Sequence, residues 1–259
     1  MKKLFLLLLM VVCSSQARVR TDTATESVLV YSVNRNKIEY QRNGDQVRSI
    51  ASITKLMTAM VTLDSDRDLD RKLMLSNRVH SSLPRQEYTR RQLLEALLIN
   101  SDNAAAETLA NDFPGGRSKF VTTMNWYAHN WDLHNTKFAD PSGLSPFNVS
   151  TVKDVADLVH TASGYWLIRD ISTKKHVSLE TQHQKQIRKI KLNHTSGKIL
   201  EFNDVIVSKT GLTSAAGWCV GLMVATASDE YVIVILGSRT KDSRLHTVKN
   251  LMYNHVIDN

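Results

Sequence analysis

Residues 205–236 read VIVSKTGLTSAAGWCVGLMVATASDEYVIVIL, and this stretch decides the fold class. It holds three runs rich in apolar and β-branched residues, at 205–208, 218–227 and 231–236. Such runs predict strands. Because short turns join adjacent runs, the strands they form must be antiparallel neighbours. The C-terminal part of the chain therefore predicts an antiparallel sheet.

A second pair of strand-like runs lies near the other end of the chain. Residues 27–33 and 37–42 flank Asn34-Arg35-Asn36, so they predict a hairpin. Between the two groups of strands, apolar residues recur at helical spacing. The predicted helices cover 53–63, 93–98, 104–110, 120–131 and 150–163, and an amphipathic helix at 245–256 closes the chain. The basic region 170–200 predicts no definite element.

This order of elements predicts an α+β fold within the broad α/β class. The simplest packing places the N-terminal and C-terminal strands in one antiparallel sheet flanked by helices. The middle helices then form an inserted lobe on one side of that sheet. The sequence shows no internal repeat and no proline-rich linker.

The N-terminus has the composition of a leader. Lys2 and Lys3 precede the apolar run 4–12, and Ser15-Gln16-Ala17 places small residues at the −3 and −1 positions of a cleavage site. This is the pattern of a secretory signal peptide. The alternative is a lipoprotein signal that uses Cys13. The run is too short to span a bilayer, which takes about 20 apolar residues.

The leader sets the expected domain organisation. We expect a signal peptide at 1–17, a flexible N-terminal segment at 18–26 and one folded domain at 27–259. The chain is then exported to the periplasm. No other stretch is long and apolar enough to cross a membrane, so we expect no transmembrane segment after leader removal.

Composition and charge limit the classes of partner. The 259 residues are 42% apolar and 22% charged, which is typical of a globular protein. The formal charge is +8, and loss of two leader lysines gives 8 − 2 = +6. An exported protein rarely meets nucleic acid, so anionic wall polymers or plain solubility explain the basic balance better. Cys219 has no partner after leader removal, so we expect a buried thiol and no internal disulfide.

The first motif is Ser52-Ile53-Thr54-Lys55, at the start of the predicted helix 53–63. Residues i and i+3 share one helical face, so the hydroxyl and the amine can meet. A serine alcohol needs a nearby base, and a lysine whose pKa is lowered by burial can supply one. The alternative is a helix N-cap at Ser52. A second Ser-x-x-Lys, at 172–175, lies in a polar basic stretch and lacks that context.

Two further motifs follow in the chain. Ser101-Asp102-Asn103 falls between two predicted helices, where side chains are exposed and where a capping turn is the alternative. Asn103 carries an acceptor and two donors that suit a peptide amide. Lys209-Thr210-Gly211 follows the first C-terminal strand, and its glycine allows close approach of a substrate backbone. A solvated strand end is the alternative for that triplet.

The order Ser-x-x-Lys, Ser-x-Asn, Lys-Thr-Gly is the signature set of penicillin-binding proteins and serine β-lactamases. With the stretches 51–59, 140–145 and 209–217, the chain resembles a low-molecular-mass penicillin-binding protein of the serine D-alanyl-D-alanine carboxypeptidase/endopeptidase family. The resemblance covers about 27–250. The chain stops after its closing helix and carries Phe113-Pro114-Gly115-Gly116, which makes it most similar to the small DD-endopeptidases.

The resemblance implies a serine β-lactamase/DD-peptidase-like fold and a set of catalytic groups. Ser52 is expected to be the nucleophile, Lys55 its base, and Ser101 the group that carries a proton to the leaving amine. The oxyanion is expected between the backbone N–H groups of Ser52 and Leu212.

The same resemblance implies the substrate-binding residues. Asn103 is expected to hold the acyl-side peptide, while Lys209, Thr210 and Gly211 hold the substrate carboxylate. Arg244 matches the family's arginine after the next strand, although an exposed arginine at a helix start is an equal alternative. No cofactor and no metal are expected, because the nine histidines show no ligand spacing.

The predicted function is hydrolysis of peptide crosslinks in peptidoglycan through an acyl-enzyme on Ser52, with penicillin as a covalent inhibitor. Removal of terminal D-Ala from pentapeptides is the first alternative, followed by a β-lactamase and a non-catalytic wall-peptide-binding protein. Expected partners are peptidoglycan peptides and β-lactams, with no nucleic acid, and peripheral association with membrane or wall is left open. The basic stretch 183–191 is expected to be a solvated segment, with contact to anionic glycan as the alternative.

Overall fold

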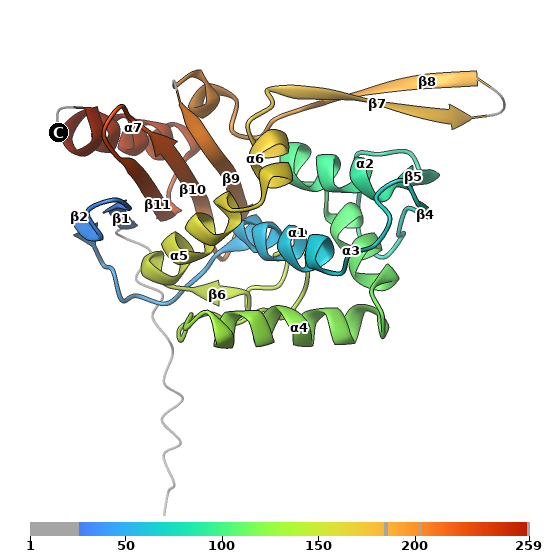
Figure 1. Ribbon diagram of the computed structural model, residues 1–259, viewed down its shortest axis with the longest axis horizontal. Helices are drawn as coiled ribbons and strands as arrows, with labels where there is room; N and C mark the ends of the chain where they lie inside the picture. The colour runs from blue at the N-terminus through green and yellow to red at the C-terminus, as the bar shows by residue number, and fades with distance from the viewer. Residues whose placement is uncertain (1–25, 184–185, 203, 258–259) are drawn as a thin grey trace, which may run out of the picture.

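The computed structural model describes residues 26–183, 186–202 and 204–257. Its centre is a five-stranded antiparallel sheet in the order β2-β1-β11-β10-β9 (Figure 1). The strands are β1 Ser27–Ser32, β2 Lys37–Arg42, β9 Val205–Thr213, β10 Gly217–Ala225 and β11 Glu230–Ser238. N-terminal and C-terminal strands pair directly, because Ser27 lies opposite Leu236 and Ser32 opposite Tyr231. The predicted joining of the two chain ends in one sheet is confirmed.

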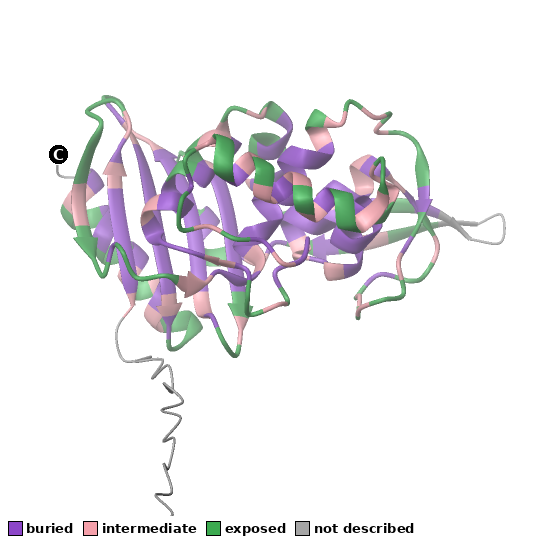
Figure 2. Ribbon diagram, turned by 90° about the horizontal axis from the view of Figure 1, so that it is seen from below, coloured by how far each residue is buried: buried purple, intermediate pink, exposed green. Residues whose placement is uncertain are grey.

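The central strands are buried on both faces, and their side chains alternate between two apolar clusters. Cys219 and Met223 of β10 point into the larger cluster, which the inserted helices complete. Val220 and Leu222 point into the smaller cluster with Val248 of the closing helix. Figure 2 shows this burial as continuous along the inner strands.

Helices cover both faces of the sheet. Helices α1 Thr54–Asp64, α5 Val152–Ser163 and α6 Trp166–Ser172 lie on the face of the larger cluster. Helix α7 Lys241–Met252 and the π-turn η4 Tyr253–Ile257 cover the other face. Thr151 caps α5 by accepting a hydrogen bond from the backbone N–H of Asp154, which fixes where that helix begins.

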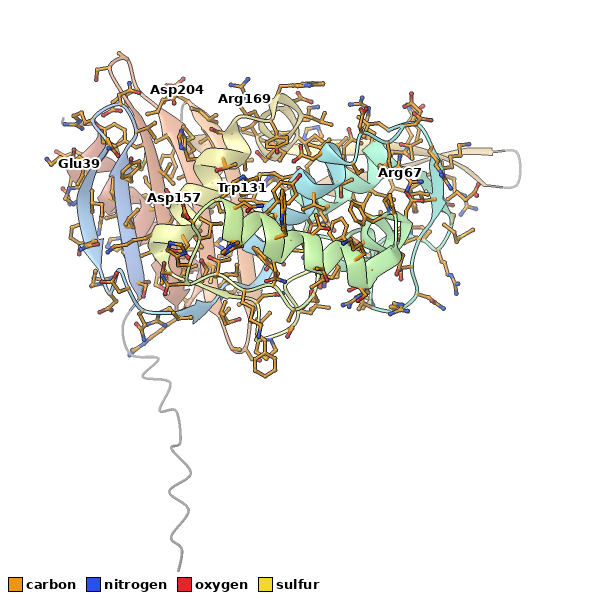
Figure 3. The ribbon with its side chains drawn as sticks, turned by 60° about the horizontal axis from the view of Figure 1, so that its bottom comes forward. Glu39, Arg67, Trp131, Asp157, Arg169 and Asp204 are labelled. Atoms are coloured by element: carbon orange, nitrogen blue, oxygen red, sulfur yellow. The ribbon has the colours of Figure 1, made fainter. Side chains whose placement is uncertain are left out.

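The inserted lobe is mainly helical, as predicted. It contains α2 Arg90–Glu95, the π-turn η2 Ala96–Asn100, α3 Asn103–Asp112 and α4 Gly116–Asn130. Two-stranded ladders complete it: β4 Lys72–Met74 with β5 Glu87–Thr89, and β3 Arg48–Ser49 with β6 Val149–Ser150. In Figure 3, Glu39 on the edge strand β2 and Arg67 in the lobe lie toward opposite ends of the molecule.

The structure corrects the interpretation of residues 170–200. Besides α6, this region forms a long hairpin of β7 His176–His183 and β8 Gln186–Asn193, followed by the 3-10 turn η3 Gly197–Glu201. The hairpin projects beyond the lobe (Figure 1). Its base is anchored because Leu179 and Leu192 are buried in the larger cluster. Frequent lysines and glutamines in this region obscured the alternation of apolar and polar residues that predicts a strand.

Two boundaries near the motifs also differ from prediction. Strand β9 continues through residue 213, so Lys209-Thr210-Gly211 lies inside the strand and does not follow it. Ser52 lies in a 3-10 turn, η1 Ala51–Ile53, and the α-helix begins only at Thr54. The predicted leader and the segment 18–25 lie outside the described residues. Within the described residues, no helix has the length and apolarity needed to cross a membrane.

Candidate active site

The 3-10 turn η1 presents Ser52 at the junction of sheet and lobe. Ala51 adopts φ +47°, which turns the chain sharply before α1. The positions that cap η1 and α1 are Ile50 and Ile53, so the proposed capping role of Ser52 is wrong. Its hydroxyl instead accepts a hydrogen bond from Lys55 Nζ at 2.8 Å.

Lys55 is completely buried, and its amine makes three hydrogen bonds. Nζ donates to Ser52 Oγ, to Asn103 Oδ1 at 2.8 Å and to the backbone carbonyl of Ser142. Burial lowers the pKa of Lys55 to about 7, against the opposing effect of the Asp140 and Asp102 carboxylates. The neutral amine therefore exists near neutral pH, and it can then accept the proton of the Ser52 hydroxyl.

The second motif divides its roles among three neighbouring residues. Asp102 caps α3, because its Oδ1 accepts from the backbone N–H of Ala105 at 2.8 Å. The capping alternative therefore holds for Asp102 only. Ser101 adopts a left-handed conformation, with φ 61°, between η2 and α3, and it lines the active-site pocket. Its Oγ accepts from Lys209 Nζ at 2.9 Å.

The third motif forms the sheet side of the site. Lys209 is fully buried, and its Nζ also donates to the backbone carbonyl of Thr210 at 2.9 Å. Burial, and then the positive charges of Lys55 and Arg244, hold the pKa of Lys209 well below its usual range. The proposal of a solvated strand end is therefore wrong. A Cβ on Gly211 would lie 3.0 Å from the backbone nitrogen of Ser52, so only glycine lets β9 pass so close to the nucleophile.

The three motifs meet in one pocket of about 370 Å³. The predicted site residues that line it are Ser52, Ser101, Asn103, Thr210, Gly211, Leu212 and Arg244. Lys55 and Lys209 do not line the pocket, and they reach it through their hydrogen bonds to the two serines. The structure thus brings all nine predicted residues together. It adds the lining residues Gly143, Leu144, Thr195, Thr213, Trp218 and Lys241, which the motifs did not include.

Arg244 is buried, so its interpretation as an exposed arginine at a helix start is wrong. Nη1 donates to the backbone carbonyl of Cys219 at 3.0 Å, and the guanidinium lies 5.4 Å from the centre of the Trp218 ring. Nε has no hydrogen-bond partner among the described residues. Burial lowers the pKa of Arg244 to about 10, so the side chain stays positive at neutral pH. A buried cation among the residues that line a pocket suits an anionic ligand.

The loop 140–148 supplies a wall that the motifs did not predict. Asp140 Oδ1 accepts from the backbone N–H groups of Ser142 and Gly143, and the Ser142 carbonyl in turn accepts from Lys55. Gly143 has φ +84°, and a Cβ there would lie 2.0 Å from the carbonyl oxygen of Ala51. The sequence Asp140-Pro141-Ser142-Gly143 already supported the family resemblance. It could not reveal that this loop contacts Lys55 through a backbone carbonyl, because every residue has one.

One other predicted feature, the thiol of Cys219, can be placed in the structure. Cys219 is buried as expected, and burial raises the pKa of its thiol to about 11. Among the described residues, no three His, Cys, Asp or Glu side chains gather as a metal ion would require.

This arrangement defines the class of protein. A serine paired with a buried lysine, a second serine–lysine pair and a cationic wall surround one pocket, and this arrangement suits a serine peptidase. Residues 13–240 match the family model described as D-alanyl-D-alanine carboxypeptidase, and the chain belongs to that family. The resemblance to low-molecular-mass penicillin-binding proteins is confirmed, and the chain is a serine D-Ala-D-Ala peptidase.

Individual relatives agree with this assignment. The chain is 33% identical to the D-alanyl-D-alanine endopeptidase of Escherichia coli K12, over 83% of this chain and 72% of the relative. It is 34% identical to the Pseudomonas aeruginosa protein of the same name, over 84% of this chain and 73% of that relative. Its fold is similar to the Streptomyces K15 DD-transpeptidase, with a TM-score of 0.81, 26% identity and coverage of 87% and 94%. It is also similar to penicillin-binding protein D2 of Listeria monocytogenes in its ampicillin-bound form. The TM-score is 0.77 and the identity 28%, over 88% of this chain and 95% of that structure.

Proposed function

We propose that this protein is an exported DD-endopeptidase that hydrolyses peptide crosslinks in peptidoglycan through an acyl-enzyme on Ser52. The hydrogen bond from the buried Lys55 amine to Ser52 Oγ carries the proposal, because it pairs an alcohol with a base titrating near neutrality. The names of the relatives from E. coli and P. aeruginosa support endopeptidase activity.

Acylation uses the first serine–lysine pair. Ser52 Oγ attacks the carbonyl of a D-Ala residue while neutral Lys55 takes the hydroxyl proton. The negative charge on the carbonyl oxygen is stabilised by the backbone N–H groups of Ser52 and Leu212. Loss of one such donor costs on the order of 10²–10³ in rate. The C–N bond then breaks and leaves an ester on Ser52, which water hydrolyses in the second half of the reaction.

Departure of the amine uses the second pair. Ser101 relays a proton to the leaving nitrogen: its hydroxyl gives up one proton while its Oγ receives another from the Lys209 amine, 2.9 Å away. The proton that Lys209 gives is then replaced from solvent. Asn103 holds the acyl-side peptide by its amide. Lys209, Thr210, Gly211 and Arg244 form the region that holds the carboxylate on the leaving side.

A DD-carboxypeptidase is the second candidate, since the matching family model carries that description. The two activities differ in what leaves after the same carbonyl is attacked. Digestion of purified muropeptide dimers and of monomeric pentapeptides, with products resolved by mass, separates them. We expect dimers to be cleaved faster, and release of D-Ala from pentapeptides with dimers intact would assign the carboxypeptidase instead.

Fluorescent penicillin tests the nucleophile and separates a DD-peptidase from a β-lactamase and from a binding protein. Wild-type protein should be labelled covalently and hold the label for many minutes, whereas Ser52→Ala should not be labelled. The Ser-x-x-Lys at 172–175 provides the matched control, so Ser172→Ala should label normally. Rapid loss of the label would indicate a β-lactamase. Labelling of the Ser52→Ala protein would exclude Ser52, and no labelling of the wild type would favour a non-catalytic binding protein.

Export is tested by the mass of the mature protein. We propose cleavage after Ala17, which gives a periplasmic chain that begins at residue 18 and carries the catalytic domain from residue 27. Intact-mass measurement on protein expressed with its leader should show loss of seventeen residues. A lipid-modified chain that begins at Cys13 would support the lipoprotein alternative, and a full-length chain would contradict export through this leader.

A further inference from the structure

The segment that follows the β7–β8 hairpin passes between the lobe and strand β9. The backbone N–H of Thr195 donates to the carbonyl of Ile99, two residues before Ser101. Ser196 Oγ accepts from Ser208 Oγ at 2.8 Å on the sheet side. Thr195 is therefore fixed by its own backbone and by its neighbour, and it lines the active-site pocket.

The hydroxyl of Thr195 meets the hydroxyl of Thr210 directly. Thr210 Oγ1 donates to Thr195 Oγ1 at 2.7 Å. A hydroxyl has only one proton to donate. Thr210 has therefore committed its proton to Thr195 and can offer only lone pairs to a ligand. The Thr195 proton has no acceptor among the described residues, so it remains available on the pocket wall.

The surroundings of Thr195 favour an anionic acceptor. Arg244, on the same pocket, carries a positive charge and a free Nε donor. His194, which precedes Thr195, adds no charge, because its Nδ1 accepts from the backbone N–H of Ser196 and burial lowers its pKa to about 4. A neutral donor and a buried cation that line one pocket can together bind and orient a carboxylate.

We propose that Thr195 is a specificity-determining residue that donates its hydroxyl proton to the carboxylate on the leaving side of the substrate. The inference rests on the proposed function and deepens it. Thr210, in the third motif, then acts on the carboxylate through Thr195, and the chain of hydrogen bonds runs from Thr210 to Thr195 to the ligand. The lobe, the exit of the hairpin and strand β9 thus contribute jointly to the recognition of one anionic group.

The test compares acylation by benzylpenicillin with acylation by its methyl ester, which lacks the free carboxylate. Thr195→Val removes the hydroxyl but keeps the shape, whereas Thr195→Ser keeps the hydroxyl. We expect Thr195→Val to lower the acylation rate constant for benzylpenicillin about tenfold or more, as loss of a hydrogen bond to a charged group does. The rate with the ester should change less than about twofold, and Thr195→Ser should retain the wild-type preference for the free acid.

A purely structural role predicts a different pattern. Ser196→Ala is the matched control, because it removes the neighbouring hydroxyl contact without touching the pocket, and it should leave the acid-to-ester rate ratio unchanged. The assignment would be overturned if Thr195→Val lowered the acylation rate constants for benzylpenicillin and for its methyl ester equally. It would also be overturned if Ser196→Ala changed the acid-to-ester rate ratio as much as Thr195→Val does. Thr195→Ala and the melting temperature of each variant provide the same comparison if the valine protein is unstable.

The inference and the proposed function fail in distinguishable ways. Wild-type protein that is not acylated by benzylpenicillin contradicts the proposed function itself. Wild-type protein that is acylated and prefers the free acid, with Thr195→Val showing the same preference, contradicts only the role of Thr195. A matched measurement of KM and kcat on muropeptide dimers should show the loss mainly in KM, since the carboxylate contact exists before and during bond breaking.

Discussion

At the scale of single residues, the site depends on two buried lysines with different surroundings. Lys55 has the carboxylates of Asp140 and Asp102 near enough to oppose part of the effect of burial on its pKa. Lys209 instead faces the positive charges of Lys55 and Arg244, which act in the same direction as burial. Both amines donate hydrogen bonds to serine oxygens, so the protonation state of each lysine acts directly on the serine hydroxyl that it contacts.

The pKa of Lys55 predicts how acylation depends on pH. The neutral amine is the active form, so the rate must rise as pH rises through about 7. We expect the acylation rate constant for benzylpenicillin to rise about tenfold per pH unit below that value and to level off above it. Lys55→Arg stays charged and should lose on the order of 10²–10⁴ in rate, while the exposed Lys72→Arg should not. A flat profile between about pH 5.5 and 8.5 would exclude Lys55 as the base.

At the scale of elements, one carboxylate makes many of the hydrogen bonds that order loop 140–148. Asp140 accepts from three backbone N–H groups, from the Ser142 hydroxyl and from the Asn148 amide. Burial alone would raise the pKa of Asp140, but these hydrogen bonds outweigh it and hold the pKa below its usual range. The loop places the Ser142 carbonyl where Lys55 Nζ donates to it. Disorder in the loop would therefore also disturb the orientation of the Lys55 amine.

Removal of that charge should therefore affect both stability and activity. We expect Asp140→Asn to lower the free energy of unfolding by about 2–4 kcal/mol, because the amide cannot accept all of these bonds. The acylation rate should fall as well. Because the folded pKa is depressed, the stabilisation is complete above the unfolded pKa of about 3.9 and is lost as pH falls through the folded value.

Urea unfolding at about pH 7 and about pH 3 measures the effect of Asp140, because the difference between wild type and Asp140→Asn should shrink only below the unfolded pKa of about 3.9. Asp45→Asn is the control, since Asp45 pairs only with Lys153 at an exposed position and should change stability by less than about 0.5 kcal/mol. Equal stability of Asp140→Asn and wild type at neutral pH would contradict the structural role of this carboxylate.

At the scale of the whole molecule, the site exists only where the sheet and the helical layer touch. Gly221 marks a close contact, because a Cβ there would lie 2.7 Å from a methyl group of Val159 in α5. The same layer contains α1, which leads directly from the nucleophile. The distance between sheet and helices therefore sets the distance between β9 and the Ser52 turn.

A larger residue at this contact should separate the two layers. We expect Gly221→Val to lower the free energy of unfolding by about 1–3 kcal/mol, as overpacking does, and to slow acylation by penicillin. Gly197→Ala is the matched control: a Cβ there meets nothing within 4 Å, and we expect a change within about 0.5 kcal/mol. Thermal unfolding and acylation rates measure both effects. A Gly221→Val protein with wild-type stability and rate would show that the layers do not fix the site.

Apolar periodicity and three short motifs are local properties of the chain, so the sequence alone predicted the sheet, the helical lobe and the nine residues that the structure brings together at one pocket. Strand β9 was predicted too short, since Lys209-Thr210-Gly211 carries little strand preference and pairs with β10 through the backbone. Only the tertiary structure decided the β7–β8 hairpin, the Ser142 carbonyl and Thr195. These depend on backbone atoms and on contacts between residues far apart in the chain, for which no residue pattern exists. Burial of Lys55, and hence its lowered pKa, likewise follows from packing, because Asn103 of the lobe and the Ser142 carbonyl of loop 140–148 both contact the amine.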